Sequence, residues 1–476
     1  MDKSTKKLLS GSVVYFVGNA LTQFVSLLLM RFVTGHITPE EYGFFNLVTT
    51  VSNLVVPLIT LQIADAVFRF VLKSDSEKEK SKYLTTCYAV SLVSVAVIVA
   101  TVFGLSLFVS MPNTLLVALY VASYALSGIY QKILRCLNRS DVFVSGNLIK
   151  TVVFIGLEIL LLSTLDMGIE ALLLAHILSL SFFIVYAEVR VFPLRYVKPR
   201  LLRIATFTEM VRFSIPLIPN AAFWWLTSSV NHVIVSAKLG MDVNGIYSVS
   251  GKFSSVLVMV TSVLNMSWQD TAIADYGKEG FDTFLTKTLN TFVKLIFSAI
   301  AVLTPLVFLV IPYMIDETYH NAIAYTPFLL MASGTSSISG FLAQIFTGRG
   351  DTKKLPLTSL AGMAGNLLAV FLLIDYIGLW GAVVGTLLSD VILVGYRLAL
   401  TRREFGRGVE YGKFLIVFGM LTVSILLFLF ASTLANLIWF FVSAALAVVL
   451  NLEFIKNIFM LLFARFFKKQ TKEDAK

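Results

Sequence analysis

Charged residues and long polar segments are scarce in this 476-residue chain. Only 14% of its residues are charged, against roughly 25% in soluble domains, and 57% are hydrophobic. The polar connections between the apolar runs are short and leave no room for a soluble domain. The composition therefore excludes most soluble functions.

The chain also lacks the motifs of several kinds of active site. Its two cysteines, Cys87 and Cys136, give neither a disulfide framework nor a metal-ligand spacing, and we expect them to be packing residues in a reducing compartment. It has no Walker A loop, no GxGxxG after a strand and no cluster of metal ligands. The external loops are too short for the catalytic acids of a polymerase or glycosyltransferase. We therefore expect no enzyme activity, no cofactor, no metal and no direct use of ATP.

Fourteen apolar stretches, each long enough to cross a bilayer, fill almost the whole chain. The first follows a basic start but is too long for a signal peptide. The predicted fold is an all-α integral membrane protein with spans at about 11–33, 44–66, 84–109, 114–134, 142–163, 168–189, 209–236, 245–269, 288–311, 325–347, 357–376, 379–396, 414–431 and 434–455.

Lys and Arg occur almost only in alternate connections between these spans. Of the 38 basic residues, 33 lie at the N-terminus, in 69–82, 132–139, 190–212, 278–287, 349–354 and 397–413, or in the tail from Lys456. Short basic loops stay cytoplasmic, so both termini are predicted to be cytoplasmic. Because these charges are dispersed over many loops, they favour contact with anionic lipid headgroups over nucleic acid binding.

The chain aligns with itself at an offset of 210 residues. The segment 167–186 matches 377–396 without a gap, with Gly168 facing Gly378, and Gly43 resembles Gly245 at a slightly smaller offset. A repeat of six spans gives two halves of the same topology. The predicted organisation is an N-terminal lobe (1–190), a cytoplasmic linker (191–208), a C-terminal lobe (209–400) and a final helix pair with a basic tail (401–476). Two lobes with a site between them are typical of transporters.

Sequence features at the first and seventh spans resemble a known family. The first span ends Arg31-Phe-Val-Thr-Gly and is followed by Pro39-Glu-Glu-Tyr-Gly, and the seventh reads PLIPNAAFWWLTSSVNHVIVSAKLG before Asn244-Gly-Ile-Tyr. With the repeat and the final helix pair, this is similar to the Wzx-type polysaccharide flippases of the MATE-like MOP superfamily, which are related to the lipid II flippase MurJ. The resemblance implies a MATE-like fold. The family often has an acid near the middle of the seventh span, where this chain has Asn231-His232, so an ion-pair role there is not carried over.

Four cations lie within or at the ends of spans, where charge is costly unless it faces water or a partner. A cavity with excess positive charge suits a diphosphate. The alternative is that their long side chains extend to the interface. The candidate diphosphate-binding residues are Arg31, Lys150, Lys252 and Lys294.

Polar and aromatic side chains in the first and seventh spans could contact a sugar, because hydroxyl groups need donors, acceptors and flat faces. The alternatives are hydrogen bonds between helices for the amides, an interfacial belt for the tryptophans and simple packing for the histidine. The candidate sugar contacts are Asn19, Gln23, Asn220, Trp224, Trp225, Ser228, Asn231 and His232.

The predicted function is a flippase that moves a polyprenyl-diphosphate-linked oligosaccharide from the inner to the outer leaflet of the bacterial cytoplasmic membrane by alternating access. The partners implied are this membrane lipid, polysaccharide polymerases and glycosyltransferases, with the protein acting as a monomer and without nucleic acid. The resemblance also implies a lipid-tail groove at the last two spans. Two alternatives stay open: a MATE-type drug/cation antiporter, and a non-transporting scaffold of a polysaccharide synthesis complex.

Overall fold

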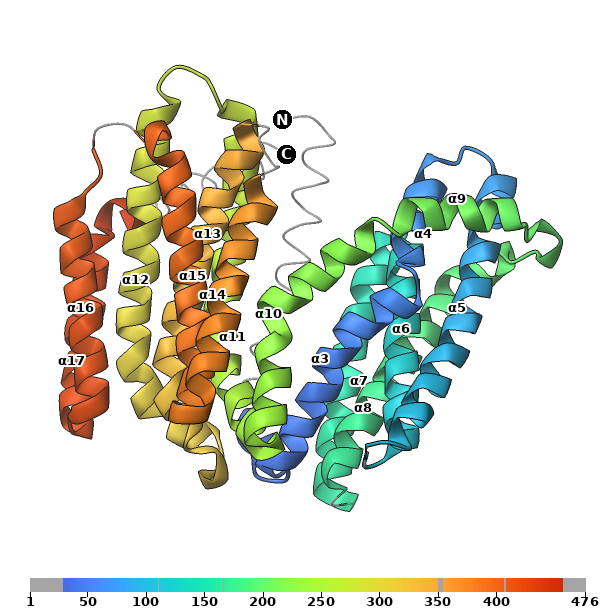
Figure 1. Cartoon of the computed structure of the whole chain (residues 1–476), viewed down its shortest axis with the longest axis horizontal. Coiled ribbons are helices and arrows are strands. Elements are labelled where there is room, and N and C mark those ends of the chain that lie inside the picture. Colours follow the sequence, from blue (N-terminus) through green and yellow to red (C-terminus); the bar gives the residue numbers. More distant parts are fainter. Residues whose placement is uncertain (1–28, 110, 166, 350–353, 406–407, 457–476) are drawn as a thin grey trace, which may run out of the picture. The chain divides into compact units, whose positions relative to one another are not determined.

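The protein is helical throughout the part of the chain that the structure describes (Figure 1). This computed structural model describes residues 29–456, apart from 110, 166, 350–353 and 406–407. It describes no side chains at 220, 223–224, 227–228, 263, 266–267, 269–271 and 273–275. The chain forms two compact units, Met1–Ser248 and Val249–Lys476.

The first unit contains the helices up to α10 and the first turns of α11. Its elements are α2 (Met30–Thr34), α3 (Pro39–Ile59), α4 (Ile63–Lys73), α5 (Glu77–Ser106), α6 (Thr114–Cys136), α7 (Ser140–Leu165), α8 (Gly168–Val191), the short 3₁₀ turns η1 (Pro193–Tyr196) and η2 (Pro199–Leu201), α9 (Ile204–Ser214) and α10 (Leu217–Leu239).

The second unit begins within α11 and runs to the end of the described chain. Its elements are α11 (Met241–Asp275), α12 (Phe281–Met314), η3 (Glu317–Tyr319), α13 (Ala322–Arg349), α14 (Lys354–Ile377), α15 (Leu379–Thr401), η4 (Arg402–Glu404), α16 (Tyr411–Phe430) and α17 (Thr433–Leu450). Within this unit α15 packs against both α13 and α14, and α12 packs against α16 and α17.

Eleven of the described helices are long and apolar enough to cross a membrane. They are α3, α5 to α8 and α12 to α17, and each coincides with a predicted span. The predicted first span lies mostly outside the described residues. The predicted seventh and eighth spans overlap α10 and α11, several of whose side chains are not described. The membrane class is confirmed, while the total of fourteen spans stays a prediction.

The second predicted span is broken in two, as its proline indicates. Helix α3 carries Pro57 and ends at Ile59, and α4 begins only at Ile63. Between them Leu61 and Gln62 adopt positive φ angles of 53° and 52°, which non-glycine residues rarely do. The proline cannot donate to the helix ladder and crowds the preceding turn, so the chain changes direction here. By contrast, α12 continues through Pro305.

Two glycines let α3 and the start of α11 cross at very short range. A Cβ at Gly43 would lie 1.8 Å from the carbonyl oxygen of Met241, and a Cβ at Gly245 would lie 1.9 Å from that of Pro39. Gly43 therefore faces the carbonyl of Met241, four residues before Gly245, and Gly245 faces the carbonyl of Pro39, four residues before Gly43. This reciprocal contact is what two equivalent segments of a repeat produce when they meet about a local two-fold axis.

The cysteines lie in the core of the first unit, as expected. Cys87 and Cys136 are free and buried, and they pack with Ile63, Ile133 and other apolar residues of α4, α5 and α6. The backbone of Tyr196 and Lys198 in the linker hydrogen-bonds Thr85 of α5. The linker is therefore fixed to the first unit.

Candidate substrate site

Two side chains of α10 that the sequence marks as candidate sugar contacts join this helix to α3 and to the start of α11. The indole N–H of Trp225 donates to the carbonyl oxygen of Thr50 at 2.6 Å. Nδ1 of His232 lies 2.8 Å from Oδ1 of Asn244, and the imidazole packs against the ring of Tyr247 with centroids 4.9 Å apart. At least these two residues therefore have structural partners within the first unit.

Asn244 connects this cluster to the glycine crossing. Its side chain is fully buried, and its amide donates to the carbonyl oxygen of Gly43 at 2.8 Å. In the sequence Asn244 stands out only as part of a motif, and the motif does not predict its hydrogen bond to the Gly43 carbonyl. The signal that could have revealed it is its place one residue before Gly245, since an amide next to a close helix contact can satisfy a neighbouring carbonyl.

The remaining predicted sugar contacts are only partly visible. Asn231 is buried in α10. Asn19 and Gln23 lie outside the described residues, and the side chains of Asn220, Trp224 and Ser228 are not described. The sugar-contact assignment therefore stays a prediction.

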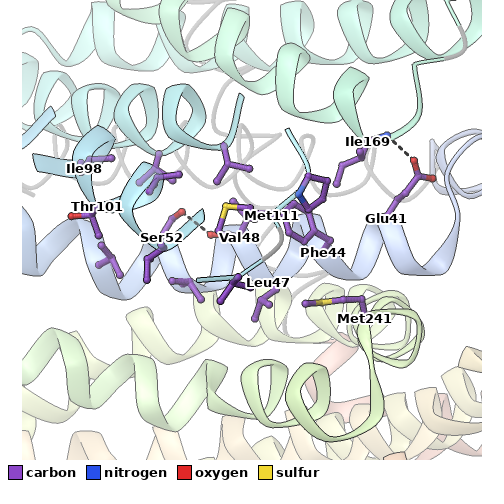
Figure 2. A pocket seen from close by; sticks show the side chains of 18 of the residues that line it. Glu41, Phe44, Leu47, Val48, Ser52, Ile98, Thr101, Met111, Ile169 and Met241 are labelled. Carbon is purple, nitrogen blue, oxygen red and sulfur yellow. Dashed lines mark hydrogen bonds between the residues drawn. The ribbon is translucent and has the colours of Figure 1, made fainter. Parts of the chain in front are cut away.

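The first unit contains an elongated apolar pocket of about 480 Å³ along one face of α3 (Figure 2). Its lining is shared by α3, α5, α6 and the connection before α6, and Met241 closes one side. Val48 and Ile98 are buried in its wall, while Val51, Leu105 and Val109 are exposed at its rim. A pocket of this size lies within the range of small-ligand sites, and its walls suit a hydrocarbon chain.

A carboxylate marks one end of this pocket. Glu41 and Thr38 form a capping box at the start of α3, and Glu41 Oε1 also accepts from the backbone N–H of Ile169 at 3.2 Å (Figure 2). The preceding residue, Gly168, has a φ of 51°, and a Cβ there would lie 2.5 Å from Glu41 Oε1. The start of α3 is thereby tied to the start of α8.

Lys150 is the candidate cation that lies farthest inside a described span of the first unit. It is the eleventh residue of α7 and is half-buried. Its Nζ lies 5.9 Å from the ring centroid of Phe183. Among the described residues it has no carboxylate within salt-bridge distance. Glu158, two turns further along α7, is buried and has a partner. Arg31, at the end of the first span, is exposed and also has a partner.

The two candidate cations of the second unit differ from each other. Lys252 is exposed on α11. Lys294 is buried in α12, and its Nζ donates to Glu410 Oε2 at 2.7 Å. Partial burial raises the pKa of Glu410, but the hydrogen bonds from Lys294 and Lys413 together lower it by more, so that this pKa lies below its ordinary value. Because Glu410 directly precedes α16, Lys294 lies near the end of a span and already has a counter-ion, which the sequence did not indicate.

A buried polar network in the second unit was missed by sequence reasoning. Arg397 was counted among the cytoplasmic basic residues, yet it lies inside α15 with only 7% of its surface exposed. Its guanidinium donates to the carbonyl and hydroxyl oxygens of Ser339 at 2.8 and 2.6 Å and to the hydroxyl of Thr358 at 3.1 Å.

Asp390 lies seven residues before Arg397, at the centre of α15. The predicted span ended at 396, whereas α15 continues to Thr401 and includes both residues. An intramembrane acid is unusual and points to function. The signal for it was the spacing of seven, which puts the acid and the base on one helix face.

The described residues provide three features that bear on function. The first unit has an apolar pocket and a cation at depth without a carboxylate partner. The second unit has a half-buried acid and a buried arginine that donates to hydroxyl groups. Within the described residues there is no group of three or more side chains able to hold a metal ion.

The fold is shared with known transporters. The structure of a lipid II flippase, MurJ, in an inward closed conformation aligns with a TM-score of 0.69 at 14% identity, covering 95% of this chain and 100% of that one. An inward-facing MATE family multidrug resistance transporter of the MOP superfamily aligns with a TM-score of 0.64 at 12% identity, covering 81% and 97%. These identities establish the fold alone. A search of curated proteins gives no match.

A family model described as "Polysaccharide biosynthesis protein" matches residues 8–273, which is more than half of the chain. The match includes α3, α10 and the glycine crossing, where the sequence resemblance was strongest. This chain therefore belongs to the polysaccharide biosynthesis protein family and has the MATE-like fold of the MOP superfamily.

Proposed function

We propose that this protein moves a polyprenyl-diphosphate-linked oligosaccharide from the cytoplasmic to the outer leaflet of the bacterial cytoplasmic membrane by alternating access. The observation that carries the proposal is the family match, combined with a fold that spans the whole length of a lipid II flippase. The apolar pocket along α3 supports a substrate with a hydrocarbon chain.

Lys150 is the strongest of the four cations for the diphosphate. Lys294 is neutralised by Glu410, while Arg31 and Lys252 are exposed. Lys150 is half-buried within a span, and its only described contact is an aromatic ring. An ammonium at that depth is stabilised by an anionic headgroup.

The membrane potential can drive the outward step. Moving one charge through 100 mV is worth about 2.3 kcal/mol. A diphosphate dianion leaving a negative interior therefore gains about 4.6 kcal/mol. This gain applies to the loaded protein, so the return of the empty carrier needs a separate source such as a coupling ion.

The test is a leaflet-accessibility assay with purified protein in vesicles and a lipid-linked oligosaccharide. Lys150→Gln should slow transport at least tenfold, because a hydrogen bond to a charged group contributes about 1.5–3 kcal/mol, while Lys150→Arg keeps most of the rate. Lys198→Gln, in the exposed linker, is the charge-matched control. An unchanged rate for Lys150→Gln would remove Lys150 from the site, and no transport by the unmodified protein would refute the function.

Asp390 favours one alternative, a MATE-type cation antiporter, because that activity needs a carboxyl group within the membrane. Binding distinguishes the two functions. Association with an organic cation that Asp390→Asn abolishes, without association with a lipid diphosphate, would favour the antiporter. A scaffold for polysaccharide synthesis would keep working when Lys150 and Lys294 are both neutralised, whereas a flippase would lose export.

A further inference from the structure

One end of the first unit, which the basic loops predict to be cytoplasmic, carries a second basic site, away from the pocket along α3 and just before the start of α10. Helix α9 runs crosswise over the ends of the long helices and packs on α4 and α5 (Figure 1). A dish of about 610 Å³ lies between α4 and α9. It is lined by Arg69 and Phe70 of α4 and by Thr208, Glu209, Arg212 and Phe213 of α9.

The two arginines of this dish are available to a ligand. Both are exposed, and among the described residues neither has a carboxylate within salt-bridge distance. The guanidinium of Arg69 is held over the ring of Phe213, with Cζ 4.3 Å from the centroid. This contact orients the planar group and leaves its N–H edges open to an anion.

The one acid in the dish is already neutralised. Glu209 lies 3.6 Å from Nζ of Lys82 and accepts from the hydroxyl of Tyr83 at 3.3 Å. The net charge presented by the dish is therefore that of two guanidinium groups, which is the complement of a phosphate-bearing headgroup.

The face of α9 beside the dish is apolar and unburied. Ile204 is 84% exposed and Phe207 37%, while Thr206, Met210 and Ser214 are buried against the unit. Exposed basic residues of the linker, among them Arg200 and Arg203, precede this helix. A helix with an apolar edge beside arginines, lying across the ends of spans, matches an interfacial helix at an anionic membrane surface.

We propose that the dish formed by Arg69 and Arg212 binds the phosphate headgroup of an anionic phospholipid of the cytoplasmic leaflet. The acyl chains of this lipid lie along Ile204 and Phe207, and both guanidinium groups hydrogen-bond its phosphate oxygens. The site fixes α9, and with it the connection to α10, at the membrane interface. The proposal does not depend on which substrate is transported.

Native mass spectrometry of the full chain tests the site by titrating phosphatidylglycerol against phosphatidylcholine. The unmodified protein should retain phosphatidylglycerol preferentially. The double variant R69Q/R212Q should lose that preference by roughly thirtyfold, since each basic residue near an anionic surface contributes about one kcal/mol. R402Q/R403Q removes the same charge at exposed positions of the second unit and should keep the preference. R69K/R212K should fall between, because lysine keeps the charge but not the bidentate geometry.

Three results would overturn the proposal. The first is an unchanged lipid preference in R69Q/R212Q that elutes as a folded monodisperse protein. The second is an equal loss in R402Q/R403Q, which would mean that general charge alone attracts the lipid. The third is farnesyl diphosphate binding in the dish more tightly than phosphatidylglycerol, which would assign the site to a diphosphate. If R69Q/R212Q does not fold, R69K/R212K provides the test: a partial loss of the lipid preference supports bidentate binding by the two arginines, and an unchanged preference overturns it.

Discussion

The crossing of α3 and α11 offers the sharpest test of the fold. Replacing Gly43 by alanine puts a methyl group 1.8 Å from the Met241 carbonyl oxygen, where ordinary contact needs at least 3.4 Å. The two helices must separate by the difference, about 1.6 Å. Helix interiors cannot absorb such a shift by rotating a side chain, because the clash is with backbone.

The cost of this separation can be worked from the contacts that it breaks. Overpacking of this kind costs about 1–3 kcal/mol. The hydrogen bond from buried Asn244 to the Gly43 carbonyl, at 2.8 Å, would be stretched beyond its range and lose about 1 kcal/mol. Alanine recovers up to about 1 kcal/mol through its higher helix propensity. The expected net loss in the free energy of unfolding is therefore roughly 1–3 kcal/mol, and Gly245→Ala should lose a similar amount.

The buried thiols of the first unit provide the assay. Cys87 and Cys136 are 0% and 2% exposed, so a thiol-reactive dye in detergent reports the unfolding of the unit that contains the crossing. A loss of this size should lower the melting midpoint by roughly 2–12 °C. Gly251→Ala is the matched control on α11, because among the described residues a Cβ there meets no heavy atom within 4 Å. It should be neutral or slightly stabilising.

The double variant G43A/G245A tests whether the two contacts form one crossing. A single separation of the helices relieves both clashes, so the double variant should lose clearly less than the sum of the single losses. Strict additivity would mean that the two glycines act independently. Neutral single variants, within about 0.5 kcal/mol, would refute the close approach itself.

Three further predictions concern paired side chains. Glu410→Gln should lower the unfolding free energy by about 2 kcal/mol. Because the pKa of Glu410 is lowered on folding, the stabilisation is present above its ordinary pKa and is lost as pH falls through the lower folded pKa. Denaturant midpoints of the unmodified protein should therefore decrease on acidification, and those of the variant should change less. Arg397→Leu removes the buried guanidinium itself and should destabilise less than Ser339→Ala combined with Thr358→Ala, which takes two hydroxyl acceptors from that guanidinium and leaves it only the Ser339 carbonyl and the Ser359 hydroxyl; the reverse order in melting midpoints would contradict the network. Trp225→Phe should lose about 1 kcal/mol with its hydrogen bond to Thr50, and an unchanged midpoint would show that this contact does not hold α10 to α3.

The repeat illustrates how far sequence reasoning reached. Gly168 and Gly378, paired at an offset of 210, have nearly equal φ angles of 51° and 56° and stand at the starts of α8 and α15. Such a match was visible because positive φ selects glycine at both places. The approach of Gly43 to Gly245 was not visible, because two similar segments in a sequence do not show that they touch each other.

The candidate cations show where sequence reasoning stopped. Lys150 and Lys294 looked equivalent in the sequence, yet only Lys294 has a described carboxylate partner, and that partner is 116 residues away. Arg397 looked like a loop residue because apolar periodicity ends near it, while the helix continues to Thr401. Pairing of distant charges and exact helix ends depend on neighbours that a local pattern does not contain.

The sequence by itself determined the membrane class and the family, while the total of fourteen spans and the cytoplasmic side of the basic loops stay predictions. The membrane class follows from how single segments partition between water and lipid, which is a local property, and the family follows from residue patterns along the chain. The tertiary structure alone decided which glycines meet, which charges are buried with partners and where pockets form. These depend on distances between residues far apart in the chain, because the contacts form only after the helices have packed.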